Sequence, residues 1–356
     1  MKSRIKGVRI SGIACVVPSG VRTIEEDAHL FGKDHIRINR LKRDIGVNKR
    51  HITLNEECTS DLCAQAAQFL FTKINYDSSK VDCLIFISQT PDYFQPATSF
   101  VLHHFLGLSK DCAVFDINLG CSGYVYGLWL GSLIISSCQC NGVLLLAGDT
   151  ISRCVSPFDP TVAPLFGDAG SATILEPAPE GYEMVFALHS DGEGYKNLII
   201  PAGGFRKRPS SETVKMIQGE DGNLRSEEHL YMNGPEIFNF SIKEVPSVIE
   251  EVLAASNWVK EDVDFFIFHQ ANKFIIQNIV RKLKIPIEKV PYDVFEKYGN
   301  QSSASIPVTI CEDLSTLLIN NSFKVVLAGF GAGLSWAACT LILGPTLCFP
   351  VLIHNQ

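Results

Sequence analysis

Short apolar runs alternate along the chain with longer amphipathic stretches. The short runs predict buried strands over 83–87, 143–147, 265–268 and 325–328. The longer stretches predict helices, most clearly over 62–74, after the capping residues Thr59-Ser60-Asp61, and over 235–255. We expect Pro246 to kink or split the second helix, because proline lacks the backbone N–H that a helix interior uses. This alternation predicts an α/β fold in which helices cover a mixed sheet.

An internal similarity divides the chain. Residues 81–86 are echoed by residues 263–268, 182 positions later, and Leu146-Ala147-Gly148 is echoed by Leu327-Ala328-Gly329, 181 positions later. We interpret this as a duplication with halves at 1–178 and 179–356. Residues 189–230 carry many charges and are expected to form an exposed excursion in the second half.

Composition narrows the class of protein. Of 356 residues, 46% are hydrophobic and only 19% charged, which is typical of a folded enzyme-sized protein and not of a disordered chain. The net charge of −7 disfavours nucleic acid as a partner. The twelve cysteines show no CxxC or Cys/His spacing suited to zinc, and the first twenty residues do not resemble a secretory signal, so we expect a cytoplasmic protein without a metal.

Two long runs lack charged residues: 117–148, and 325 to about 353. Glycine interrupts both runs, and proline also interrupts the second, so each favours buried strands and helices over a membrane span. We expect no membrane association.

A candidate nucleophile follows a predicted strand at 113–116. Gly120-Cys121-Ser122-Gly123 opens the apolar stretch 124–135, which favours a buried helix. A thiol in the first turn of such a helix would meet unpaired N–H groups and the positive end of the helix dipole, and both lower a thiol pKa. We therefore expect Cys121 to be an activated nucleophile, although a buried structural cysteine would fit this motif alone.

Two further motifs lie in the second half. His269 follows the predicted strand 265–268, a place where α/β sheets bind ligands but where a single histidine is often structural. By the duplication, Cys121 corresponds to Ser302 or Ser303, so the loop Tyr298-Gly299-Asn300-Gln301-Ser302-Ser303 is expected to face the nucleophile. The turn 329–333 lacks the GxGxxG spacing of a dinucleotide loop; it either offers N–H groups to an oxyanion or only permits a tight turn.

Together these motifs resemble, in order and over essentially the whole chain, the β-ketoacyl-acyl carrier protein synthase III family of the thiolase superfamily. Further matches lie at Ile45-Gly46-Val47-Asn48-Lys49-Arg50-His51, Thr90-Pro91-Asp92-Tyr93 and Phe166-Gly167-Asp168-Ala169-Gly170. The resemblance implies a thiolase-like fold with duplicated halves, in five αβαβα layers, and a homodimer. It implies Cys121 as the acyl-accepting nucleophile, His269 and Asn300 as its partners, and the backbone N–H groups of Cys121 and Ala332 as the oxyanion hole.

The chain departs from this family at positions that bind substrate. Residues 34–44 lack the tryptophan that stacks on the adenine of coenzyme A, and Pro160 falls near the position of a paired arginine. Lys273 and Phe274 stand after Asn272, where the family often has a basic residue. Gln95, beside Phe94, replaces an aromatic residue of the acyl pocket. We expect these five residues, 94, 95 and 272–274, to contact substrate.

The first hypothesis for function is an acyltransferase that forms an acyl-enzyme on Cys121 and condenses it with a malonyl-type thioester, with loss of CO₂. The substrate is an acyl-CoA or an acyl-carrier thioester, and no cofactor is expected. Alternatives are acyl transfer to a hydroxyl or amine, with His269 as general base, and a non-catalytic partner subunit of a condensing complex.

Basic residues gather in two stretches of this acidic protein. One stretch includes Arg40 and Arg43, and the other is Arg206-Lys207-Arg208. Acyl carrier proteins are acidic, so we expect these residues to dock a carrier, although a solvated basic face without a partner would look the same.

Overall fold

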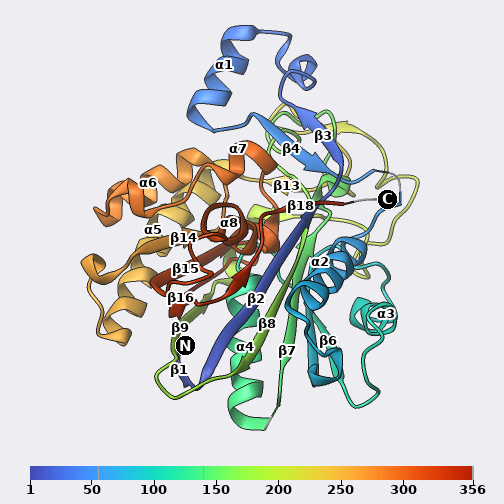
Figure 1. Ribbon diagram of the computed structural model, residues 1–356. Coiled ribbons are helices and arrows are strands. Elements are labelled where there is room, and N and C mark those ends of the chain that lie inside the picture. The colour runs from blue at the N-terminus through green and yellow to red at the C-terminus, as the bar shows by residue number, and fades with distance from the viewer. Residues whose placement is uncertain (55, 139, 355–356) are drawn as a thin grey trace.

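Two mixed β-sheets face each other across shared central helices in Figure 1, a computed structural model that describes residues 1–54, 56–138 and 140–354. The first sheet has the order β17-β2-β8-β7-β5-β6, with β18 also paired to β2. Its strands are β2 (Val8–Val17), β5 (Cys83–Ile87), β6 (Ala113–Ile117), β7 (Val143–Asp149), β8 (Ala169–Pro177), β17 (Leu347–Cys348) and β18 (Leu352–Ile353). The second sheet, in the order β1-β9-β16-β15-β14, has strands β1 (Lys2–Lys6), β9 (Glu183–Ser190), β14 (Phe265–Phe268), β15 (Phe323–Gly331) and β16 (Ser335–Leu343).

The two sheets repeat one pattern of pairing. In the first sheet β5 is parallel to β7, and β7 is antiparallel to β8. In the second sheet β14 is parallel to β15, and β15 is antiparallel to β16. The chain ends cross between the sheets, because β1 joins the second sheet while β17 and β18 join the first. The boundary at residues 178/179 stays a prediction.

The helices complete the five layers that the resemblance implied, so the predicted fold class is confirmed. They are α1 (His35–Asp44), α2 (Thr59–Ile74), α3 (Thr98–Phe105), α4 (Gly123–Cys138), α5 (Gly234–Ser256), α6 (Lys273–Leu283), α7 (Val294–Tyr298) and α8 (Ser305–Leu314). Helices α2 and α3 cover the outer face of the first sheet, and α5 and α6 cover that of the second. Helices α4 and α8 lie between the sheets, where both sheets bury apolar side chains.

Helix α4 is apolar on most sides because it is packed between two sheets. Its contact with the first sheet is very close at Gly127, where an added Cβ would lie 2.3 Å from Ile87 Cδ1 and 2.6 Å from Leu145 Cδ1. A larger residue here would have to displace the ends of both side chains, so glycine favours the close packing of α4 on the first sheet.

Pro246 does not split α5, because the helix runs unbroken from Gly234 to Ser256, so that part of the prediction was wrong; a kink stays a prediction. Proline at 246 leaves the carbonyl of Ile242 without its helical N–H donor. The Lys282 ammonium of α6 donates to that carbonyl at 2.8 Å. A partner from the neighbouring helix therefore satisfies the group that proline leaves unpaired.

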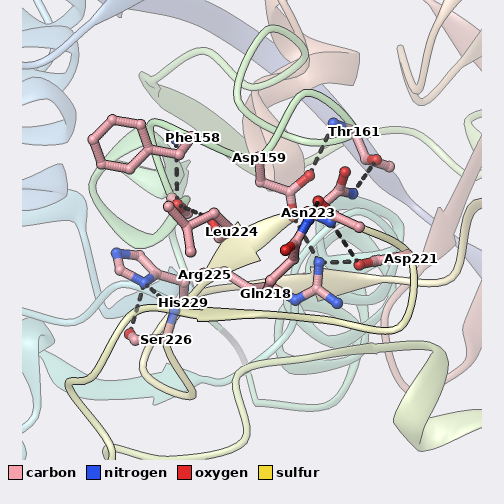
Figure 2. A network of polar contacts seen from close by, with 12 residues as sticks. Phe158, Asp159, Thr161, Gln218, Asp221, Asn223, Leu224, Arg225, Ser226 and His229 are labelled. Atoms are coloured by element: carbon pink, nitrogen blue, oxygen red, sulfur yellow. Dashed lines mark hydrogen bonds and ion pairs between the residues drawn. The ribbon is translucent and has the colours of Figure 1, made fainter.

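The excursion over 189–230 is exposed over much of its length, as expected, but it is anchored. It contains the hairpin of β11 (Ile217–Gln218) and β12 (Leu224–Arg225), and β10 (Leu198–Ile199) pairs with β13 (Tyr231–Met232) at its ends. Figure 2 shows Arg225 between two carboxylates, 3.0 Å from Asp159 and 2.8 Å from Asp221, while Asn223 donates to Thr161 at 2.7 Å. Buried Asp159 thus ties the hairpin to the loop at 156–161.

A last small sheet pairs β3 (Gly20–Thr23) with β4 (Lys49–Ile52) beside α1, which stands at the top of Figure 1. Apart from residue 139, which lies outside the described residues, the two uncharged runs form strands, loops and α4, as expected. Within the three described ranges, no helix combines the length and the apolar composition that a membrane crossing requires.

Candidate active site

Cys121 lies in the loop between β6 and α4, at the level where the parallel strands of the first sheet end. The helix begins at Gly123, so Cys121 precedes it instead of lying in its first turn; that part of the prediction was wrong. The loop closes before the helix, because Gly123 N–H donates to the Gly120 carbonyl at 2.7 Å. The neighbouring Ser122 hydroxyl is 2.6 Å from that of Ser335 on β16, which ties the loop to the second sheet.

His269 directly follows β14, as predicted, and only 2% of its surface is exposed. Its Nδ1 lies 2.7 Å from the Ser305 hydroxyl at the start of α8, and its ring makes an edge contact with Phe330. Burial lowers the pKa of His269 to about 3, against an opposing hydrogen bond with the Ser302 backbone. The imidazole is therefore neutral at physiological pH, so it can donate one hydrogen bond and accept another.

Backbone hydrogen bonds to the segment at 165–167 hold Asn300 in place between α7 and α8. Its N–H donates to the Leu165 carbonyl at 2.8 Å, and its carbonyl accepts from Gly167 N–H at 3.1 Å. Its side-chain oxygen accepts from Ser302 N–H at 2.9 Å. With the oxygen engaged, the NH₂ group of the carboxamide is the side left to donate to a substrate.

Cys121, His269 and Asn300 line one cavity of about 300 Å³, so the structure brings the three predicted residues together. The same cavity is lined by Asn272 and Phe274. The rest of its wall is mainly apolar and includes Leu165, Phe166, Leu198, Met232, Ile237, Phe238, Ile275 and Phe330. An apolar cavity that ends at a thiol, an imidazole and a carboxamide suits a thioester with an extended chain.

The surroundings of the Cys121 sulfur include both predicted oxyanion donors. Hydrogen bonds from the backbone of Cys121 and of Ala332 act on the thiol. Gly331 makes this approach possible, because an added Cβ there would lie 2.9 Å from the sulfur. An acyl carbonyl carbon bonded to Sγ would place its oxygen near the same two N–H groups.

The thiol itself is not activated at rest, which contradicts the sequence prediction. Burial, and next the negative charge of Asp149, raise the pKa of Cys121 to about 12. A hydrogen bond with the Ser302 side chain and the two backbone hydrogen bonds oppose the shift without reversing it. The helix N-terminus is outweighed because the sulfur is removed from water, which disfavours the thiolate.

Three of the predicted substrate-binding residues lie outside this cavity. Lys273 forms an ion pair with Glu296 at 2.8 Å. Gln95 and Phe94 are exposed, and Phe94 lines a second cavity of about 870 Å³ with Gln89, Asn118 and Cys154. Their contact with substrate stays a prediction.

The predicted carrier-docking residues form two separate groups. Arg40 and Arg43 are exposed on α1, and both pair with Asp44, at 3.4 and 2.7 Å. In the excursion, Lys207 pairs with Glu227, and Arg208 lies over the ring of Phe205.

Sequence reasoning missed Asp149, at the end of β7. Its carboxylate is fully buried, and its contacts include the Ser303 hydroxyl at 2.9 Å. The chain did carry a signal: a charged residue ends the apolar strand whose Leu-Ala-Gly sequence defined the duplication. The predicted approach of Ser302 to Cys121 does occur.

Comparison with known proteins decides the family. Residues 115–192 match the family described as 3-Oxoacyl-[acyl-carrier-protein (ACP)] synthase III, and residues 253–343 match its C-terminal part. A beta-ketoacyl-[acyl-carrier-protein] synthase III of Clostridium perfringens is 35% identical over 300 residues, 84% of this chain and 88% of the relative. The chain belongs to the 3-oxoacyl-[acyl-carrier-protein] synthase III family.

Other members of the family agree over nearly the full length. The synthase III of Symbiobacterium thermophilum is 31% identical and covers 96% of this chain and 99% of its own. The crystal structure of a 3-oxoacyl-(acyl-carrier protein) synthase from Burkholderia xenovorans superposes with a TM-score of 0.93 at 37% identity, over 99% of both chains. The chain is therefore a condensing acyltransferase.

Proposed function

We propose that the protein forms a carbon–carbon bond in two half-reactions at one thiol. First, Cys121 Sγ attacks the carbonyl of an acyl thioester; a C–S bond forms, and the donor leaves as a thiol that carries the proton from Sγ. Second, the bond to the carboxylate of a malonyl-type thioester breaks with release of CO₂, and the resulting enolate carbon attacks the acyl carbonyl. The C–S bond to Cys121 breaks, and the released thiolate takes up a proton from solvent. The cavity carries this proposal, because a thiol, an imidazole and a carboxamide face one space there.

The second half-reaction assigns roles to the polar groups. His269 and the NH₂ group of Asn300 donate hydrogen bonds to the thioester oxygen on which the enolate charge develops. A neutral imidazole suits this role, since its N–H donates a hydrogen bond without adding a fixed positive charge. The N–H groups of Cys121 and Ala332 hold the oxygen of the acyl group under attack.

The acyl donor that we propose is a carrier-bound thioester. Residues 34–44 lack the tryptophan that the family uses to stack on coenzyme A, and Pro160 stands near the position of the family's paired arginine. Arg225 does reach the loop beside Pro160, but Asp159 and Asp221 already neutralise its charge (Figure 2). A nucleotide phosphate would have to compete with two carboxylates for that guanidinium.

The carrier is proposed to dock on basic side chains around the entrance to the cavity. The chain just after α1 reaches the cavity wall, because the Ile45 carbonyl accepts from Lys273 N–H at 3.0 Å, next to Asn272. Arg40 and Arg43 on this helix are the stronger candidates for this reason. Residues 206–208 lie on the excursion, whose neighbouring Gly203 and Gly204 line the second cavity.

A homodimer is part of the proposal. Strand β6 is an edge strand of the first sheet. In the part of the chain that the structure describes, no strand pairs with its outer edge. Helix α3 packs beside β6 and exposes Phe100 and Phe105, by 57% and 49%. An unpaired edge beside exposed aromatic rings favours pairing with a second copy. Light scattering should report twice the mass of one chain; a monomer at micromolar concentration would contradict it.

We propose that the reaction needs no metal or cofactor, because a thiol, an imidazole and backbone N–H groups supply the chemistry above. Within the described ranges, no group of three or more His, Cys, Asp or Glu side chains could hold a metal ion. A catalytic thiol must stay reduced, which supports a cytoplasmic location.

The test is intact-protein mass spectrometry after incubation with matched acyl-CoA and acyl-carrier thioesters, followed by a malonyl thioester. We expect the mass of one acyl group on Cys121, faster loading from the carrier, and CO₂ release when the malonyl donor is added. Acyl transfer to a hydroxyl or amine without CO₂ would contradict condensation. Absence of any acyl-enzyme would contradict the role of the cysteine.

A further inference from the structure

A buried carboxylate joins the two halves of the chain directly behind the site. Asp149 ends β7 in the first half, and none of its surface is exposed. One oxygen, Oδ1, accepts from the loop after β5: Gln89 N–H at 2.7 Å, Ser88 Oγ at 3.1 Å and Thr90 Oγ1 at 3.3 Å. The other oxygen, Oδ2, accepts from Ser303, through its hydroxyl at 2.9 Å and its N–H at 3.2 Å.

The turn that Asp149 holds contacts each reactive side chain through Ser302. The Ser302 N–H donates to the Asn300 side-chain oxygen at 2.9 Å, and the Ser302 backbone hydrogen-bonds to His269. Its side chain lowers the pKa values of the Cys121 thiol and of Asp149, so it acts on both groups. Ser302 makes these contacts with a φ of 48°, a left-handed conformation that costs a non-glycine residue energy. A strained residue at a functional centre must be held by its neighbours, and here the neighbour is a carboxylate.

We propose that Asp149 is a positioning residue for condensation: its carboxylate holds the Ser302-Ser303 turn. Through Ser302, the turn sets how the cysteine, the histidine and the asparagine face one another. Asp149 does not line the cavity, so it cannot touch the substrate; it acts through these neighbours and through the effect of its charge on the Cys121 thiol. This inference rests on the proposed function, since it assigns a role within that reaction.

The charge of Asp149 supplies an independent readout. Burial raises the pKa of the Asp149 carboxyl itself, while hydrogen bonds from Gln89 and Ser303 lower it. In its charged form Asp149 raises the pKa of the Cys63, Cys121 and Cys154 thiols. Removing the charge should ease ionisation of Cys121, whereas removing the Ser302 hydroxyl should hinder it. If Asp149 and Ser302 only stabilised the fold, replacing them would not change the reactivity of the Cys121 thiol in opposite directions.

The experiment compares Asp149→Asn, Ser302→Ala and Ser303→Ala with the wild-type protein. Alkylation of Cys121 by iodoacetamide near pH 8, followed by peptide mass spectrometry, needs no substrate. It therefore tests the inference even if the proposed reaction fails. We expect Asp149→Asn to speed alkylation at least about threefold and Ser302→Ala to slow it by a similar factor, since one pKa unit changes the thiolate fraction about tenfold.

In the same variants, kcat of condensation should fall while KM stays near that of wild type. We expect about tenfold or more for Asp149→Asn and severalfold for Ser303→Ala, because small displacements of reacting groups are costly. Ser303→Ala removes one donor and keeps the charge, so it tests the link even if Asp149→Asn does not fold.

Asp168 provides the matched control. It is equally buried and accepts from Thr53 N–H at 2.8 Å and Ser152 N–H at 2.9 Å, but its side chain does not contact the 302–303 turn. Asp168→Asn should leave Cys121 alkylation within about twofold of wild type. The inference is overturned if Asp149→Asn slows or does not change alkylation, if Ser303→Ala leaves kcat unchanged, or if the control matches Asp149→Asn in both measurements.

Discussion

The buried centre and the basic helix α1 use charge in opposite ways. In the centre, Cys121 and His269 have pKa values moved far from their ordinary range, because burial removes water and fixed neighbours decide which proton state is stable. On α1, Arg40 and Arg43 are about three-quarters exposed and share Asp44, whose carboxylate pKa is lowered mainly by its hydrogen bond with Arg43. The contrast teaches that the centre determines the chemistry, whereas the surface can only adjust how often a partner arrives.

The largest effect is expected at the nucleophile. Cys121→Ala should abolish the acyl-enzyme and lower condensation by about 10³-fold or more, since no other thiol, hydroxyl or amine among the described residues lines the cavity. Cys154→Ala, in the second cavity, is the matched control and should load normally. If intact mass shows that Cys121→Ala is acylated at the full rate, Cys121 is not the nucleophile.

The next effect separates the two half-reactions. His269→Ala and Asn300→Ala should lower CO₂ release from a malonyl thioester by roughly 10²–10³-fold and acyl loading much less, because both residues are assigned to the enolate oxygen. Loading and decarboxylation are measured separately, by mass and by trapped CO₂. With a thiol pKa raised to about 12, loading needs a proton acceptor; if His269→Ala stops loading in a folded protein, the imidazole is that acceptor.

The third prediction concerns how the free energy of unfolding depends on pH. Burial lowers the pKa of His269 from 6.5 to about 3 in the folded protein, so the unfolded state binds more protons between these values. The free energy of unfolding should therefore fall as pH drops below 6.5, by up to about 1.4 kcal/mol per pH unit, and this ring should add no slope above 6.5. His269→Gln cannot titrate and should lose less stability between about pH 7 and pH 5 in urea denaturation. Equal losses would show that the folded site accommodates the charged ring.

The smallest effect is expected on α1. Replacing Arg40 and Arg43 together with Glu should slow loading from an acyl carrier severalfold at low salt, and less at high salt, because exposed charges are screened. Loading from coenzyme A should not change. Lys73→Glu, on the outer helix α2, is the control for the change in net charge that either single replacement, Arg40→Glu or Arg43→Glu, makes. Salt-independent loading from the carrier would reject this docking surface.

The parts of the structure that were predictable depend on local pattern. The apolar runs predicted the first and last residues of β5 and β14 correctly, because a buried strand needs only continuous apolar character. The duplication placed the loop at 298–303 opposite Cys121, and the resemblance to the family added His269 and Asn300 as partners of the thiol.

What failed depended on residues distant in sequence. Pro246 is tolerated because Lys282 satisfies Ile242, and no local pattern shows that contact. The direction of the Cys121 pKa shift was missed because the fold buries the sulfur and places Asp149 nearby. Asp149 itself was missed because its donors lie at 88–90 and 303, far along the chain on either side.

The exchange of terminal strands between the sheets limits how this protein can be divided. A fragment that ends near residue 178 would keep β1, which belongs to the other sheet, and would lack β17 and β18. A fragment that begins there would lack β1, so Met184, Val185 and Phe186 on β9 would have an unpaired edge. Each piece would carry an open strand edge that the other covers, which makes it prone to aggregate. Production of either half alone is therefore expected to fail, whereas co-expression of both offers a route to complementation.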